Sequence, residues 1–191
     1  MRILLLSIIT LTSVLINAQI PKNLERDAKK VYDATYNMDF NTILDYTYPK
    51  IFDIVDRNTM YETLDKTFQN EEFSIRFVNP TPNFKYSDIK TIGNQKFCLI
   101  SYNNALRMKF EEPLDDETVS IMTEAFQSSM KDYKITYEKE RNGFLLEGPD
   151  MLIAISDSLT KNEWRFLNHD EDQIDFLDKI LTTSVRKQLG L

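Results

Sequence analysis

Residues 96–110 of the chain read KFCLISYNNALRMKF. Apolar side chains recur at every second position of this run, which predicts a long β-strand with one strongly apolar face. That face carries Cys98, Ile100, Tyr102, Leu106, Met108 and Phe110, whereas Ser101, Asn103, Arg107 and Lys109 lie on the other face. Phe97 and Leu99 add apolar side chains to the second face, so we expect the first half of the strand to be buried on both sides.

Turn signals upstream of this strand indicate its first partners. Gly93-Asn94 immediately precedes the strand and is typical of a tight hairpin, so residues 84–92 are predicted to pair with it in antiparallel fashion. Alternating side chains over residues 73–78 predict one further strand, which Asn79-Pro80 ends.

A second group of strands is predicted downstream. Arg141-Asn142-Gly143 is the strongest hairpin signal of the chain and joins a strand at 133–137 to one at 144–155. We expect Gly148-Pro149 to interrupt the latter with a bulge or kink. Residues 164–167 form the last predicted strand.

Helical spacing accounts for the other segments. Apolar stripes predict three helices before the first strand, one between the two groups of strands and one near the C-terminus. These stripes are Leu24–Tyr32 after Asn23, Phe40–Leu44 capped by Asp39, Met60–Phe68 starting near Asn58, Val119–Met130 opened by Asp115-Asp116-Glu117, and Ile174–Leu181, followed by a last turn capped by Thr183 or Ser184.

This order of elements predicts an α+β fold. Strands joined by tight turns pair antiparallel, and the first helices are segregated from them. We therefore expect N-terminal helices packed on a curved antiparallel sheet of about six strands, with one inserted and one C-terminal helix. The concave side of such a half-open cone is a natural pocket.

The N-terminal residues 1–18 have the pattern of a secretory signal peptide. Arg2 precedes an apolar run over residues 3–16, and Ala18 supplies a small residue at the predicted cleavage site. The run is shorter than the roughly 20 apolar residues that a spanning helix needs. We expect residues 19–191 to form a single domain that is exported, to the periplasm or the medium, with no stable membrane anchor after cleavage.

Composition and charge exclude several classes of function. The chain has 23 Lys and Arg against 30 Asp and Glu, a net charge of −7, with no basic run that would favour nucleic acid. Cys98 and His169 are the only residues of their types, so we expect neither a metal site nor an internal disulfide, and we interpret Cys98 as a buried small hydrophobe and His169 as a surface or capping residue. The four glycines form no dinucleotide or phosphate loop, so no cofactor is expected.

One stretch of the sequence resembles a known superfamily. Val31-Tyr32-Asp33-Ala34 and Met38–Tyr46 are similar to the opening helical hairpin of nuclear transport factor 2-like proteins, and Trp164-Arg165-Phe166 resembles their closing strand. The predicted helix at 116–131 departs from the simplest pattern of that superfamily. The resemblance implies a cone-shaped α+β fold, and it leaves function open because the superfamily includes enzymes, transport factors and non-catalytic binding modules.

Candidate ligand-binding residues are aromatic or cationic side chains predicted near the cone. They are Tyr46, Tyr48, Tyr102, Arg107 and Trp164, and each is also compatible with a purely structural role in the core or at the surface. The absence of a catalytic constellation in the sequence favours an exported, non-catalytic module of the cell envelope. We expect it to bind a small apolar molecule or another protein.

Two other functions stay open at this point. Some enzymes of the superfamily move a proton next to a carbonyl with Tyr and Asp, so a small isomerase or dehydratase could use Asp45 or Asp150 with a tyrosine. The third hypothesis is an envelope protein that forms a homodimer through its sheet.

Overall fold

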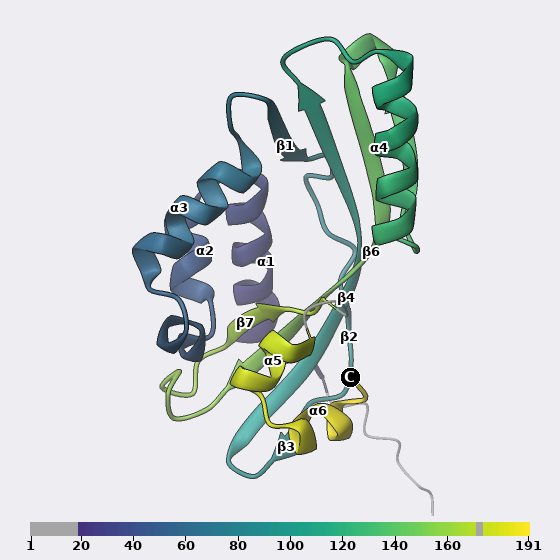
Figure 1. Ribbon diagram of the computed structural model, residues 1–191. Coiled ribbons are helices and arrows are strands. Elements are labelled where there is room, and N and C mark those ends of the chain that lie inside the picture. The colour runs from purple at the N-terminus through teal and green to yellow at the C-terminus, as the bar shows by residue number, and fades with distance from the viewer. Residues whose placement is uncertain (1–18, 171–173) are drawn as a thin grey trace, which may run out of the picture.

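Two long antiparallel strands form the spine of the protein in the computed structural model, which describes residues 19–170 and 174–191 (Figure 1). Strand β4 (Gln95–Phe110) pairs continuously with β6 (Gly143–Ser156), from Lys96 opposite Ser156 to Lys109 opposite Gly143. The predicted signal peptide at residues 1–18 lies outside the described residues. The predicted strand at 96–110 is confirmed, and Gly93, at φ 61°, turns the chain into it.

Shorter strands extend this spine at both ends into an antiparallel sheet. At the upper end in Figure 1, β1 (Phe73–Phe77) pairs with β4, and β5 (Lys134–Glu138) pairs with β6. At the lower end, β2 (Lys85–Tyr86) and β3 (Lys90–Ile92) pair with β4, and β7 (Arg165–Asn168) pairs with β6. The described chain thus has an α+β fold around a seven-stranded sheet.

The sheet differs from the prediction at two places. The expected strand at 84–92 is divided into β2 and β3 after Ser87. The backbone N–H of Ser87 still donates to the carbonyl of Leu99 (2.9 Å), but its hydroxyl, not its carbonyl, accepts the return hydrogen bond from the N–H of Leu99 (2.9 Å). The interruption expected at Gly148-Pro149 is absent, because β6 continues through both residues and stays paired with β4. Pro149 is tolerated because it lies between the end of β5 pairing at Glu147 and the start of β7 pairing at Leu152, where no second neighbour needs its missing N–H.

The N-terminal helices cover one face of the sheet. They are α1 (Lys22–Tyr36), α2 (Phe40–Tyr46), the 3-10 turn η1 (Pro49–Asp53) and α3 (Arg57–Phe68). Asp39 caps α2 as predicted, accepting a hydrogen bond from the backbone N–H of Thr42 (3.1 Å). Pro21, not Asn23, is the N-cap of α1, and Asp56 caps α3.

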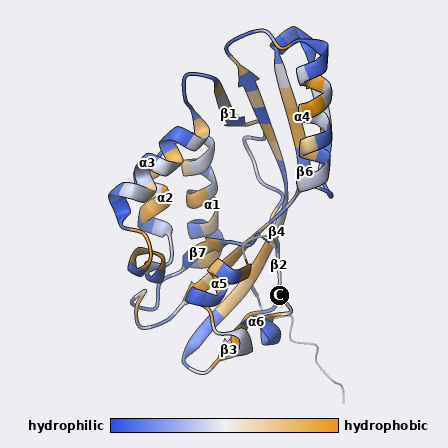
Figure 2. Ribbon diagram, in the orientation of Figure 1, coloured by the Kyte–Doolittle hydropathy of each residue, from blue (hydrophilic) through white to orange (hydrophobic). Residues whose placement is uncertain are grey.

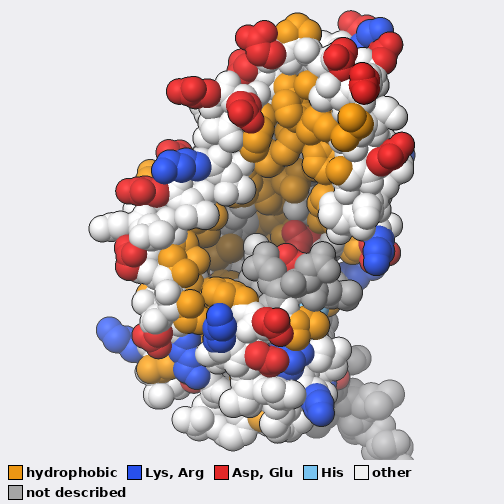
Figure 3. All heavy atoms as spheres, in the orientation of Figure 1, with side chains coloured by type: hydrophobic (Ala, Val, Ile, Leu, Met, Phe, Trp, Pro, Cys, Tyr) orange, Lys and Arg blue, Asp and Glu red, His pale blue; other side chains and the backbone are white. Residues whose placement is uncertain are grey.

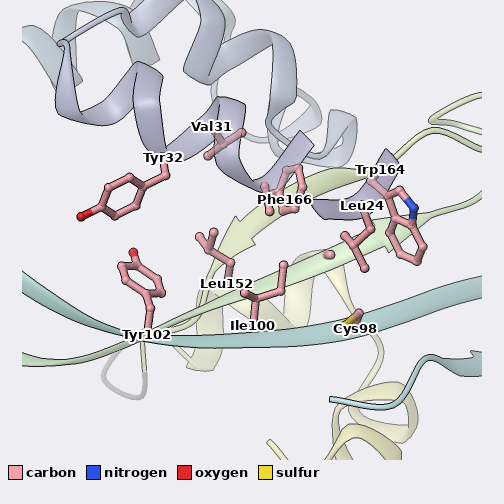
Figure 4. Packing of buried hydrophobic residues seen from close by; sticks show 11 residues of the cluster. Leu24, Val31, Tyr32, Cys98, Ile100, Tyr102, Leu152, Trp164 and Phe166 are labelled. Carbon is pink, nitrogen blue, oxygen red and sulfur yellow. The ribbon is translucent and has the colours of Figure 1, made fainter. Parts of the chain in front are cut away.

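The lower half of the sheet is buried on both faces, as the pattern of residues 97–100 predicts. On the first face α1 packs against β4, β6 and β7 (Figure 4). The buried residues of this core are Leu24, Ala28, Val31, Tyr32, Cys98, Ile100, Tyr102, Leu152, Ala154, Trp164 and Phe166.

Two C-terminal helices cover the second face of the lower half. They are α5 (Ile174–Ile180) and α6 (Thr183–Leu189), and Thr182 caps α6 rather than the predicted Thr183 or Ser184. Leu177, Ile180, Leu181 and Leu189 pack on Phe97, Ile153, Ile155 and Leu167. No helix in residues 19–170 or 174–191 is long and apolar enough to cross a membrane.

The upper half of the sheet meets helices only at its two edges: α3 and the end of α1 contact β1, and α4 (Asp116–Ser129) lies beside β5 (Figure 1). Asp115 caps it by accepting a hydrogen bond from the backbone N–H of Thr118 (2.8 Å). Phe126 of α4 contacts Phe144 of β6, with ring centroids 5.2 Å apart. The upper end of β4 alternates between hydrophobic and hydrophilic residues (Figure 2), so only one of its faces favours burial.

Candidate functional site

An apolar hollow opens on the concave face of the sheet, between helices α1–α3 on one side and α4 on the other (Figure 3). It exists because these helices stand at opposite edges of the upper half and leave the strands between them uncovered. The hydrophobic side chains of β1 and β4 that alternate onto this face are all half-buried. We call these residues the apolar floor: Phe73, Ile75, Phe77, Leu106, Met108 and Phe110.

Aromatic contacts hold the floor in place. Phe73 lies across from Phe110 in the ladder, with ring centroids 6.1 Å apart, and Phe110 meets Phe144 edge-on at 6.3 Å. On the helical side, Phe68 of α3 lies 6.2 Å from Phe77. Aromatic pairs in such tilted and edge-to-face arrangements contribute about 0.5–1.5 kcal/mol each beyond the burial of area, and so help to fix the floor.

A polar cluster lies on the same face where the upper and lower halves meet. Asp150 of β6 is directly opposite Tyr102 of β4, and the Tyr102 hydroxyl donates a hydrogen bond to Asp150 Oδ2 (3.1 Å). The Nδ2 of Asn104 donates to the same oxygen (3.1 Å), and the backbone N–H of Met151 donates to Oδ1 (2.8 Å). The carboxyl group is thus held by donors on both of its oxygens.

Tyr133 completes this cluster from the segment between α4 and β5. Its ring lies over Gly148, where a Cβ would come within 2.4 Å of the ring, so only glycine leaves room for it. Burial raises the pKa of Tyr133 to about 12, with the charge of Asp150 acting in the same direction and the amide of Asn104 opposing both. We use "polar cluster" below for Tyr102, Asn104, Tyr133 and Asp150.

Burial sets the electrostatics of the polar cluster. The pKa of Asp150 is raised, chiefly because burial disfavours its charged form, although three hydrogen bonds oppose the shift. The nearby charge of Asp170 raises it further. Burial also raises the pKa of Tyr102, and the charge of Asp150 adds to this effect, so Tyr102 is a neutral donor at neutral pH.

Two of the predicted ligand-binding residues belong to the core below the hollow. Tyr102 and Trp164 are both buried in the hydrophobic core that packs against α1. Only Tyr102 also makes a hydrogen bond within the polar cluster. Tyr46 packs on the edge of this core, at 6.5 Å from Phe166 between ring centroids, beneath the guanidinium of Arg165.

The other two predicted residues lie elsewhere. Tyr48 is fully buried in the core on the opposite face of the sheet, where its hydroxyl donates to Asp157 (2.7 Å). Arg107 points away from the hollow and makes two hydrogen bonds to Glu138 (2.6 and 3.1 Å), so its charge is already compensated. The structure therefore does not bring the five residues together in one site.

Sequence reasoning missed Asn104, Tyr133 and the whole apolar floor as parts of a site. The alternation of Leu106, Met108 and Phe110 was available as a signal, but it does not distinguish a covered face from an open one. Of the two aspartates considered for catalysis, Asp45 is exposed and pairs with Arg57 (2.7 Å), whereas Asp150 contacts Tyr102.

The remaining candidates carry less chemistry. Cys98 is buried in the core as predicted, and His169 is half-buried, with an Nδ1 that lacks a hydrogen-bond partner in the described part of the chain. A groove of about 540 Å³ adjoins the polar cluster and is lined by the segment after β1 and by facing residues of β4 and β6, among them Asn104 and Gly148. Four of its nine lining residues are asparagines, namely Asn79, Asn83, Asn103 and Asn104.

Comparisons with protein-family models, with curated proteins and with solved structures give no match to this chain. The resemblance to nuclear transport factor 2-like proteins therefore stays a prediction.

Proposed function

We propose that this protein is a non-catalytic binding module that takes a small apolar molecule in the hollow on its concave face. The observation that carries the proposal is the apolar floor, a contiguous set of half-buried side chains that the chain's own helices leave uncovered. Contiguous exposed apolar surface of this kind marks interaction sites in soluble proteins.

The shape of the surface favours a small molecule over a flat protein partner. Helices α3 and α4 stand on either side of the floor and limit access to it from the sides, so the hollow is open at the front (Figure 3). Floor residues on paired strands, such as Ile75 and Met108, are directly opposite each other, so an apolar molecule would contact both strands at once. Burying its surface there would contribute about 25 cal/mol per Å².

Export is part of the proposal and is supported by the sequence pattern of residues 1–18 alone. N-terminal sequencing of protein recovered from outside the cytoplasm tests it, and Gln19 is the expected first residue. Intact Met1 on exported protein would contradict cleavage.

The binding function is tested with N-phenyl-1-naphthylamine, an uncharged apolar dye whose fluorescence rises in apolar surroundings. Met108→Lys places a charge on the apolar floor and is expected to abolish the fluorescence rise. Lys109→Glu is the matched control, because the neighbouring side chain is exposed on the opposite face and the dye should bind as before. Absence of dye binding to the unmodified protein contradicts the proposal.

One observation favours a second candidate function, proton transfer next to a carbonyl. The Tyr102–Asp150 pair combines a carboxyl whose pKa is raised by burial with a neutral phenol that donates to it. The test is exchange of the α-protons of a simple ketone such as cyclohexanone for deuterium in D₂O, followed by NMR. An enzyme would accelerate the exchange, and Asp150→Asn would remove the acceleration.

A further inference from the structure

The charge of Asp150 lacks a counter-ion in the described structure. Its partners, Tyr102, Asn104 and the backbone of Met151, are all neutral donors, and no Lys or Arg of the described residues lies within ion-pair distance. A carboxylate that is half-buried without a compensating cation is costly, and a bound cation would remove that cost.

A second polar atom beside it also lacks a partner. Asn104 is 4% exposed, and its Oδ1 is buried without a hydrogen bond from any described residue. Its Nδ2 already donates to Asp150, so the free atom is an acceptor. The polar cluster therefore has an excess of acceptors and a carboxylate without a cation, and a cationic donor matches both features.

The strands around the hollow keep positive charge away from it. Arg76, Arg107, Lys109 and Lys134 all alternate onto the opposite face of the upper sheet. The upper rim, in contrast, is acidic (Figure 3). Its exposed acidic residues are Glu71, Glu72, Glu111, Glu112, Asp115, Asp116 and Glu117.

We propose that the ligand of the hollow is a cationic amphiphile, an apolar chain or ring system that bears one ammonium group. The apolar part lies on the floor, and the ammonium group donates to the carboxylate of Asp150. This inference rests on the proposed binding function and adds the chemical class of the ligand to it.

The chemistry of the polar cluster fits an ammonium group better than the alternatives. An ammonium group has three donors and no acceptor, so it leaves no lone pair facing Asp150 or Asn104. The faces of aromatic rings attract cations, and the rings of Tyr102 and Tyr133 border the cluster. A fatty acid would place its carboxylate beside Asp150, and the acidic rim would repel it as it approached.

Three probes with the same apolar chain test the proposal: dodecylamine, dodecanol and dodecanoate, each below its micelle concentration. Binding to the unmodified protein is measured by isothermal titration calorimetry at about 0.15 M salt, where long-range attraction is largely screened. We expect dodecylamine to bind at least about tenfold more tightly than dodecanoate, with dodecanol between them.

Two variants separate local from general electrostatics. Asp150→Asn should remove most of the preference for the amine while leaving the affinity for dodecanol nearly unchanged. Asp116→Asn changes the net charge by the same amount on the exposed rim and should keep the preference. If both variants lose it equally, net charge explains the result and the assigned site is wrong.

The outcomes also distinguish this inference from the proposed function. Binding of all three probes with equal affinity, or tighter binding of dodecanoate, overturns the cationic ligand and leaves the apolar site standing. Failure of every probe overturns the apolar site itself. The comparison of probes on the unmodified protein decides between these outcomes even if Asp150→Asn does not fold.

Discussion

The hydroxyl of Tyr48 lies 2.7 Å from Oδ2 of Asp157, although 109 positions separate the two residues in the chain. The bond ties the segment after α2 to the end of β6, and Gln95 at the start of β4 donates to the same carboxylate (2.7 Å). Burial of Asp157 would raise its pKa, but the hydrogen bonds from Tyr48 and Gln95 outweigh this and hold the pKa below its usual value. Three distant parts of the fold thus meet at one charged group.

Removing this hydroxyl should destabilise the protein without changing its fold. Tyr48→Phe keeps the buried ring and deletes one hydrogen bond to a charged acceptor, so we expect a loss of about 1.5–3 kcal/mol in the free energy of unfolding. Urea denaturation followed by circular dichroism measures it. Tyr46→Phe is the control, because the structure gives the Tyr46 hydroxyl no hydrogen bond to another described residue. Equal losses in the two variants would contradict the assigned bond.

Acid pH should favour the folded state through Asp150. Its pKa in the folded protein lies above the usual carboxyl value, chiefly because of burial, so the folded state takes up a proton before the unfolded state does. The penalty for the buried charge is therefore present at neutral pH and is lost as the pH falls through the raised pKa. The unfolding temperature of the unmodified protein should rise relative to Asp150→Asn between about pH 7 and about pH 4.

The comparison with Asp150→Asn is needed because other carboxyls act in the opposite direction. Asp157, for example, has a lowered pKa and makes the folded state less stable as the pH falls. Subtracting the variant's curve isolates Asp150. An unfolding temperature of the unmodified protein that falls relative to Asp150→Asn toward acid pH would show that the carboxyl is stabilised as an anion, contrary to our assignment.

Local patterns predicted most of the elements, whereas the site depends on contacts that no local pattern encodes. Asp39 and Asp115 cap their helices as expected, because a cap involves only the next few residues. The pairing of Tyr102 with Asp150 depends instead on the register of two strands 48 positions apart. A shift of that register by one residue would move Asp150 to the other face.

The hollow could not be predicted for a related reason. Leu106 and Met108 alternate in the same way as Cys98 and Ile100, yet the second pair is covered by α1 and the first is left half-buried. Which half of a strand a helix covers follows from the path of the chain. The sequence of the strand therefore predicts an apolar face, but it does not predict whether a helix of the same chain covers that face.

Gly148 is expected to be required for the polar cluster. In Gly148→Ala the new Cβ would lie 2.4 Å from the ring of Tyr133, which would have to move away. Overpacking of this kind costs about 1–3 kcal/mol in unfolding free energy, and it should also weaken amine binding. Glu147→Ala, one position away on the opposite face, loses only a 3.7 Å ion pair with Lys134 and should bind the amine as the unmodified protein does. The measurements are urea denaturation and calorimetry on the same samples, and normal amine binding by Gly148→Ala would place the head group elsewhere.

The C-terminal helices should be an integral part of the domain. Leu177 of α5 is 5% exposed and packs with Phe97 and Ile153 on the second face of the sheet, whereas Ile174 of the same helix is 37% exposed. Leu177→Ala would leave a cavity against the sheet, and we expect it to lower the unfolding free energy by about 2–5 kcal/mol. Ile174→Ala removes a side chain of similar size from the same helix and should have a much smaller effect. A truncation after His169 tests the same conclusion on a larger scale. It would uncover the second face of the lower sheet, so we expect insoluble or unfolded material. A soluble truncated protein with an unchanged melting temperature would mean that α5 and α6 are an appendage, and in that case Leu177→Ala should not change the unfolding free energy either.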